Sequence, residues 1–158
     1  MSVWGTFRAR SWSLVGLCIL GAFFLSSCGV EEALSSSDRG AYTDAAAAFV
    51  DANATFQRAQ VAPGDGESMT EALDAMRAAL TDMQSAEAEM TKAVRGLDGE
   101  SKAVAARGAS SAAGVIAASE AFIAAVEAND PVAWTKAYEA NSVAIDEFNA
   151  ATEAWNNL

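Results

Sequence analysis

The sequence predicts an all-α fold, an antiparallel up-down four-helix bundle that follows a cleaved N-terminal signal helix. Three observations lead to this prediction. Apolar residues repeat with a spacing close to 3.5 residues, the period of helices that pack in bundles. Alanine, the strongest helix former, occupies 38 of the 158 positions. Short breaks divide the periodic part into four segments, and short connections place neighbouring helices antiparallel.

The first two segments repeat large apolar residues every seven positions. In the first segment Tyr42, Phe49 and Phe56 share one face, and Pro63-Gly64-Asp65-Gly66 interrupts the chain. Ser68-Met69-Thr70-Glu71 matches a capping box, which marks the start of the second helix. The seam expected on that helix comprises Met69, Leu73, Met76, Leu80, Met83, Glu87, Met90, Val94 and Leu97. We expect its methionines to fill the core, because the flexible thioether suits gaps between alanines.

The third and fourth segments continue the helical pattern. Gly96 and Asp98-Gly99 form a stop and a turn, and the third helix is expected from about residue 101 to residue 128. Asp130 is the expected N-cap of the fourth helix, with Pro131 at its first position, where the missing N–H costs nothing. The face of the fourth helix is predicted to carry Trp134, Tyr138, Asn141, Ile145, Phe148, Thr152 and Trp155.

Composition excludes several classes of function. The chain contains no histidine, which rules out Ser-His-Asp and Cys-His catalytic sets and imidazole-ligated metals. A formal net charge of −11 argues against nucleic acid as a partner, since that binding depends on basic residues at phosphates. Calcium-loop, phosphate-loop and S-x-x-K motifs do not occur in the sequence. We therefore expect no catalytic residues, no metal and no non-covalent cofactor, and hence no enzyme.

The first thirty residues have the charge pattern of an export signal. Arg8 and Arg10 are the only charged residues before Glu31, and both are positive. The following stretch, Ser11 to Val30, is uncharged and has an apolar centre from Leu14 to Leu25. A positive start followed by an apolar stretch of about 7–15 residues is typical of a signal peptide. A spanning helix would need roughly 20 mostly apolar residues, so export is the better interpretation.

The residues Leu25-Ser26-Ser27-Cys28 resemble the lipobox of bacterial lipoproteins, and the resemblance covers residues 1 to about 29. It implies that a signal peptidase recognises Leu25, Ser26 and Ser27 and cuts before Cys28. It also implies that the Cys28 thiol carries diacylglycerol and that its amino group is often acylated. The expected location is the cell membrane, lipid-anchored on the extracytoplasmic face. The alternative is an ordinary Cys28 thiol at the end of an uncleaved anchor, with Cys18 a small hydrophobic residue.

The predicted organisation has three parts: a signal peptide (residues 1–27), the lipidated cysteine with a flexible spacer (28–40) and the helical bundle (41–158). The spacer is predicted because its stretch of serines carries little apolar material. Removal of the signal takes away two basic residues and no acid, which leaves 8 basic and 21 acidic residues, a net charge of −13. Such a surface would be repelled by anionic lipid headgroups.

Three polar residues interrupt the predicted seams. Glu87 is the one charged residue on the seam of the second helix. One interpretation places Ala86 and Met90 inward and leaves Glu87 at the rim. The other buries Glu87 in a hydrogen bond with Asn141 or Thr152, which would fix the register of the helices.

The leading functional hypothesis is a small lipoprotein whose bundle is a non-catalytic binding or structural module, with the membrane and an unidentified protein as partners. The alternative is a carrier or sensor module for an apolar small molecule held between helices. The groove of that carrier would be formed by Met83, Glu87, Tyr138 and Ile145. Trp134 and Trp155 would plug the ends of the bundle or, less often, form a cup for a flat ligand. A third hypothesis is assembly with the helices of another protein.

Overall fold

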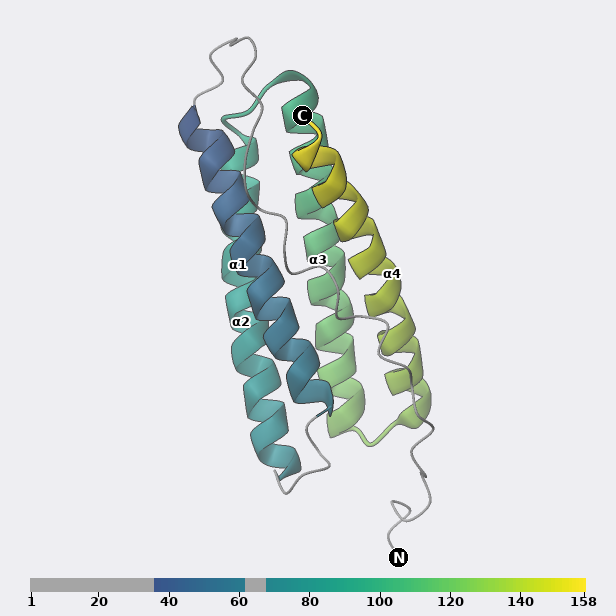
Figure 1. Ribbon diagram of the computed structural model, residues 1–158. Coiled ribbons are helices and arrows are strands. Elements are labelled where there is room, and N and C mark those ends of the chain that lie inside the picture. Colours follow the sequence, from purple (N-terminus) through teal and green to yellow (C-terminus); the bar gives the residue numbers. More distant parts are fainter. Residues whose placement is uncertain (1–35, 62–67) are drawn as a thin grey trace, which may run out of the picture. The chain divides into compact units, whose positions relative to one another are not determined.

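The computed structural model describes residues 36–61 and 68–158, which belong to one compact unit. This part of the chain is an all-α four-helix bundle (Figure 1), as the sequence predicts. The predicted signal peptide, Cys28 and the Pro63–Gly66 break lie outside the described residues. The helices are α1 (Ser36–Val61), α2 (Met69–Val94), α3 (Gly99–Glu127) and α4 (Pro131–Asn156).

Contacts between α2 and α3 show that these helices run antiparallel. Arg77 of α2 forms an ion pair with Glu127 of α3. Seven residues further along α2, Gln84 donates a hydrogen bond at 2.9 Å to Glu120, which lies seven residues earlier in α3. One step forward on α2 is therefore matched by one step back on α3.

Small residues set the closest helix pairs. The backbones of α1 and α2, and those of α3 and α4, make the most extensive close approaches, and each pair lies side by side in Figure 1. A short side chain at the interface allows two helices to approach closely. On α3, Gly114 and Gly108 lie near Ala144 and Ala151 of α4. The buried alanines spaced by seven are Ala45, Ala52 and Ala59 on α1, Ala72, Ala79, Ala86 and Ala93 on α2, the pairs Ala105 with Ala112 and Ala118 with Ala125 on α3, and Ala137, Ala144 and Ala151 on α4.

The methionines of α2 fill the core, with one exception. Met76, Met83 and Met90 are at most 3% exposed and lie in the same core cluster as the buried aromatic side chains. Met69, the first residue of α2, is 38% exposed. The prediction of a core stripe is confirmed for three residues, and the fourth lies at the helix end.

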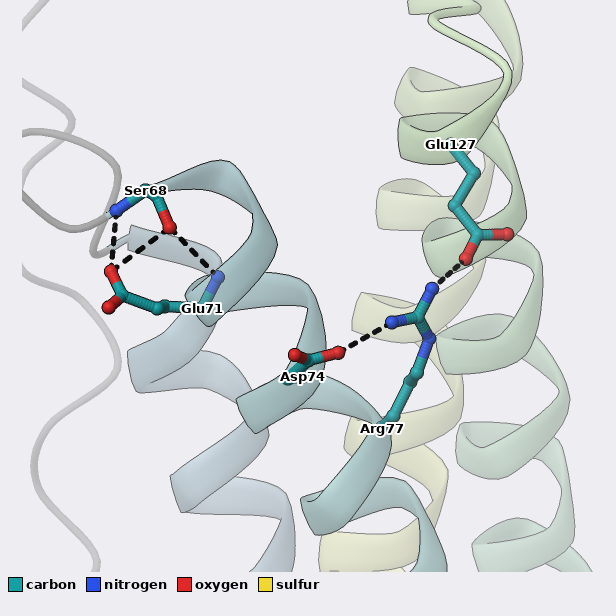
Figure 2. A network of polar contacts seen from close by, with 5 residues as sticks. All are labelled: Ser68, Glu71, Asp74, Arg77 and Glu127. Carbon is teal, nitrogen blue, oxygen red and sulfur yellow. Dashed lines mark hydrogen bonds and ion pairs between the residues drawn. The ribbon is translucent and has the colours of Figure 1, made fainter.

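Two helix starts match the predictions. Glu71 accepts hydrogen bonds from the backbone N–H and the hydroxyl of Ser68, and its own N–H donates to that hydroxyl, which completes the capping box (Figure 2). Hydrogen bonds from the Ser68 N–H and hydroxyl lower the pKa of Glu71. At α4 the Asp130 carboxylate accepts from two backbone N–H groups, both at 3.0 Å, and Pro131 occupies the first helical position.

Helix α1 begins earlier than predicted. The expected spacer extends to Gly40, but the helix already includes Ser36. The first turns of α1 are held by the end of α4, where the Arg39 guanidinium lies 5.1 Å from the ring centroid of Trp155. The Thr43 hydroxyl donates to the Arg39 carbonyl and accepts a hydrogen bond from the Trp155 indole at 3.2 Å. These tertiary contacts extend the helix into a stretch whose composition favours a spacer.

Helix α3 is long and apolar enough to cross a membrane, judged by length and composition alone. In the described part of the chain it packs in the bundle, and 44% of its most apolar window is buried there. An apolar helix of a soluble bundle has the same composition.

Gly108 of α3 lies beneath the hydroxyl of Tyr42, and a Cβ atom at position 108 would collide with that oxygen. Burial raises the pKa of Tyr42 to about 12. The Tyr42 ring packs against Trp155 with centroids 4.6 Å apart, so it has little room to retreat. At Gly114 a Cβ would meet only the Ala144 methyl at 3.5 Å, an ordinary contact.

We predict that Gly108→Ala and Gly114→Ala have opposite effects on the free energy of unfolding. Gly108→Ala should destabilise the bundle by about 1–2 kcal/mol, because overpacking outweighs the gain in helix propensity. Gly114→Ala should stabilise it by up to about 1 kcal/mol. Urea unfolding followed by circular dichroism measures both values. Tyr42→Phe should relieve part of the loss in the Gly108→Ala background, and equal effects of the two glycine substitutions would contradict the packing described.

Candidate functional site

An open hollow of about 360 Å³ lies over the interface of α3 and α4. Arg107 and Glu147 on its rim are exposed. A site for a small molecule normally encloses most of its ligand, and this hollow is open to solvent. It therefore makes a weak candidate. Its lining residues are Arg107, Ser110, Ser111, Glu147, Ala150 and Ala151.

The interface between α1 and α4, here called the α1–α4 seam, is built differently from the others. The two backbones make little close approach, and aromatic rings fill the space between them. Tyr42 contacts Trp155 with ring centroids 4.6 Å apart, and Phe49 contacts Phe148 at 5.0 Å. The pairs are seven residues apart on both helices, so α1 and α4 are antiparallel in this register. We call this half of the seam, near Ser36 and the C-terminus, its upper half (top of Figure 1).

In the lower half of the seam, toward residues 61 and 131, the register set by these two ring pairs places Phe56 level with Asn141. Phe56 packs instead against Phe122 of α3, with centroids 6.3 Å apart. Asn141 is 4% exposed and donates a hydrogen bond at 3.2 Å to the Ser119 hydroxyl, which is fully buried. The Oδ1 atom of Asn141 has no hydrogen-bond partner. The hydrogen-bonded pair of Asn141 and Ser119 thus lies where the repeat would place a third aromatic pair between α1 and α4.

Two further carboxamides lie on the lower half of α1. Asn53 and Gln60 are seven residues apart, on the stripe that begins with Arg39, which contacts α4. The Oδ1 atom of Asn53 and the Nε2 atom of Gln60 are buried and have no hydrogen-bond partner. The register of the seam places Gln60 level with Tyr138 and Asn53 level with Ile145. The lower half therefore gathers three carboxamides with unused hydrogen-bonding capacity.

Two half-exposed aromatic rings lie on the same half of α4, where Tyr138 is level with Gln60 in this register and Trp134 is four residues nearer the start of the helix. Trp134 is 42% exposed and Tyr138 is 50% exposed, with ring centroids 6.5 Å apart. Trp134 also contacts Phe122 at 6.0 Å, and Phe122 contacts Phe56. A continuous run of rings thus leads from the core to the surface. The lower half of the seam combines apolar rings with neutral polar groups.

The seam is also uncharged below Arg39, on a chain whose net charge is −11. On the opposite side of the bundle, the interface of α2 and α3 carries the Arg77–Glu127 ion pair and Glu120. By helical spacing the residues at the rim of the α1–α4 seam are Thr43, Val50 and Gln57 on α1, and Thr135, Ser142, Asn149 and Asn156 on α4. All of these are neutral, which favours a neutral partner.

The four residues of the predicted carrier groove do not share one surface. Met83 lies in the core and is fully buried. Glu87 is half-buried on α2 and accepts a hydrogen bond at 2.7 Å from the Thr91 hydroxyl. Tyr138 is half exposed on α4, and Ile145 is half-buried on the same helix.

Of the two interpretations of Glu87, the rim position is confirmed. Ala86 is 7% exposed and Met90 is fully buried, so these residues face inward and Glu87 does not. The predicted hydrogen bond from Glu87 to Asn141 or Thr152 is wrong, because both of those side chains form hydrogen bonds elsewhere. Glu87 follows Met83 by four residues, which is about 40° more than one helical turn, so it lies on the flank of the face that carries Ala86 and Met90.

The two tryptophans near the ends of α4 differ in their exposure. Trp155 is 5% exposed and plugs its end of the bundle, whereas Trp134 is half exposed. The sequence analysis did not single out Asn53 and Gln60, although both lie at multiples of seven residues from Arg39. Within residues 36–61 and 68–158, no group of three His, Cys, Asp or Glu side chains could hold a metal ion. Comparison with protein-family models, curated proteins and solved structures finds no match to the chain.

We predict that Ser119→Ala lowers the free energy of unfolding by about 1–3 kcal/mol, because it leaves the buried Asn141 amide without its partner. Adding Asn141→Leu should recover most of this loss, since replacing both polar partners by apolar groups is close to neutral. Urea unfolding measures the three proteins, and Ser110→Ala at an exposed position of α3 is the control. An unchanged midpoint in Ser119→Ala would contradict the buried hydrogen bond.

Proposed function

We propose that the chain is a small lipoprotein, anchored on the extracytoplasmic face of the cell membrane, whose bundle is a non-catalytic binding or structural module. The observation that carries the proposal is Leu25-Ser26-Ser27-Cys28 at the end of an apolar stretch that follows Arg8 and Arg10. Two or more acyl chains on Cys28 would give durable attachment, at about 0.8 kcal/mol per buried CH₂.

Charged side chains of the bundle form contacts within α2 and between α2 and α3. In Figure 2 the carboxylate of Glu71 caps α2, while Arg77 joins Asp74 of its own helix to Glu127 of α3. Arg77 and Glu127 are about half exposed, so their ion pair contributes little stability. Of the contacts named here, the Arg77–Glu127 pair is the one that joins two helices.

The proposed anchor would attach on the N-terminal side of α1. Cys28 lies eight residues before Ser36, a span of at most about 30 Å at roughly 3.6 Å per residue. Helix α1 has 26 residues and is therefore about 39 Å long. The lower half of the α1–α4 seam lies at the end of α1 remote from Ser36.

Metabolic labelling with tritiated palmitate tests the anchor. We expect the full chain to be labelled in a bacterial host, Cys28→Ala to lose the label and Cys18→Ala to keep it, because only Cys28 follows the lipobox. Gel fluorography with quantification of the protein band gives the result. Equal labelling of the two cysteine variants, or an intact Met1 in the mature protein by mass spectrometry, would reject the proposal.

A further inference from the structure

We propose that the lower half of the α1–α4 seam binds an extended, uncharged peptide segment. In this site the carboxamides of Asn53 and Gln60 hold the peptide backbone, and the rings of Trp134 and Tyr138 receive its apolar side chains. The inference rests on the proposed role of the bundle as a binding module and names the class of its partner.

Three buried carboxamide atoms in the lower half of the seam lack a hydrogen-bond partner. A buried polar group left unsatisfied costs about 1–3 kcal/mol, and native proteins satisfy roughly nine in ten of them. Here Asn53 Oδ1, Gln60 Nε2 and Asn141 Oδ1 all lack a partner, and the Asn141 side chain is 4% exposed. A carboxamide presents a donor and an acceptor side by side, which matches the donor and acceptor of a peptide group.

The spacing of the carboxamides and of the two rings matches the repeat of an extended peptide. Seven residues separate Asn53 from Gln60, which is about 10.5 Å along α1. Three residues of extended chain cover about 10 Å, so one strand edge reaches both carboxamides. The ring centroids of Trp134 and Tyr138 are 6.5 Å apart. Alternate side chains on one face of an extended peptide are separated by about 6.6 Å, so successive ones meet the two rings.

The neutrality of the seam selects an uncharged segment. The two carboxamides, Tyr138 and the rim residues defined above carry no charge, while the chain as a whole has a net charge of −11. An acidic peptide would be repelled by the surrounding surface, and a basic one would find carboxylate partners on other faces. Recognition therefore depends on backbone hydrogen bonds and apolar contacts.

Contacts join α1 to α4 in the upper half of the seam, so the peptide would enter at the lower half. In the upper half the ring pairs and the Trp155–Thr43 hydrogen bond tie α1 to α4. Among the described residues, the ring contacts and hydrogen bonds that join these two helices lie in that half. Asn53 and Gln60 belong to half-buried residues, so rotation of their side chains, with a small separation of the helices, presents the carboxamides to a ligand.

The test titrates the full chain, in detergent micelles, with a hexapeptide of alternating leucine and serine that is acetylated and amidated at its ends. We expect saturable NMR shifts of the Trp134 indole and of the Asn53 and Gln60 side-chain amides, with a Kd below about 1 mM. The double variant Asn53→Leu/Gln60→Met should weaken binding at least tenfold and should unfold at the same or a higher urea concentration, since it removes unpaired polar groups. Gln84→Met, a carboxamide on the α2–α3 side, is the matched control and should bind normally.

Two further probes decide the class of ligand. The same hexapeptide with every second backbone nitrogen methylated should not bind, because the methyl groups remove the N–H donors. A linear tetrasaccharide of N-acetylglucosamine should not bind either, and saccharide binding without peptide binding would overturn the proposal in favour of a glycan. Absence of binding by all probes, or equal binding of the methylated peptide, would also overturn it. Palmitate labelling of Cys28 is measured separately, so failure of the peptide site and failure of the anchor are distinguishable.

Discussion

The arrangement of the bundle depends on one packing constraint, small residues on the facing surfaces of α1 and α2 and of α3 and α4. Buried alanines on α1 and α2, and alanine opposite glycine on α4 and α3, bring each pair of backbones close together. Where a helix packs its small residues against one neighbour, larger side chains can fill the wider space toward another neighbour. Tyr42, Phe49, Phe148 and Trp155 fill this space across the upper half of the α1–α4 seam.

The lower half of the same seam differs because α4 carries Asn141 where the repeat calls for a ring. Its hydrogen bond to Ser119 turns the amide toward α3, and Phe56 turns toward Phe122, so neither side chain joins α1 to α4. The result is a bundle with a tightly held end and a more polar end. The best-attested use of a buried polar layer is to fix the register of helices, and this layer also supplies hydrogen-bonding groups that apolar packing would not.

Features set by local rules were predictable from the sequence, and features set by tertiary contacts were not. The fold class follows from heptads and alanine content, and the helix starts at Ser68 and Asp130 follow from side chains that bond to nearby amides. The start of α1 at Ser36 depends on Trp155, more than a hundred residues away, so composition alone placed it too late. The seam site is visible only once the ring pairs fix the register of α1 against α4. Lipidation at Cys28 continues to rest on the sequence pattern.

Native-state hydrogen exchange of the full chain, followed by NMR at amide resolution, tests the central claim that aromatic pairs join α1 to α4 in the upper half of their seam only. The account predicts that amides of residues 54–61 of α1 and 135–141 of α4 exchange faster than those of residues 42–50 and 148–155. We also expect the amides of α2 and α3 to keep the highest protection from exchange along their whole length, because local opening begins where contacts are fewest. Uniform protection along α1 and α4, or faster exchange at the Tyr42–Trp155 end, would contradict the account.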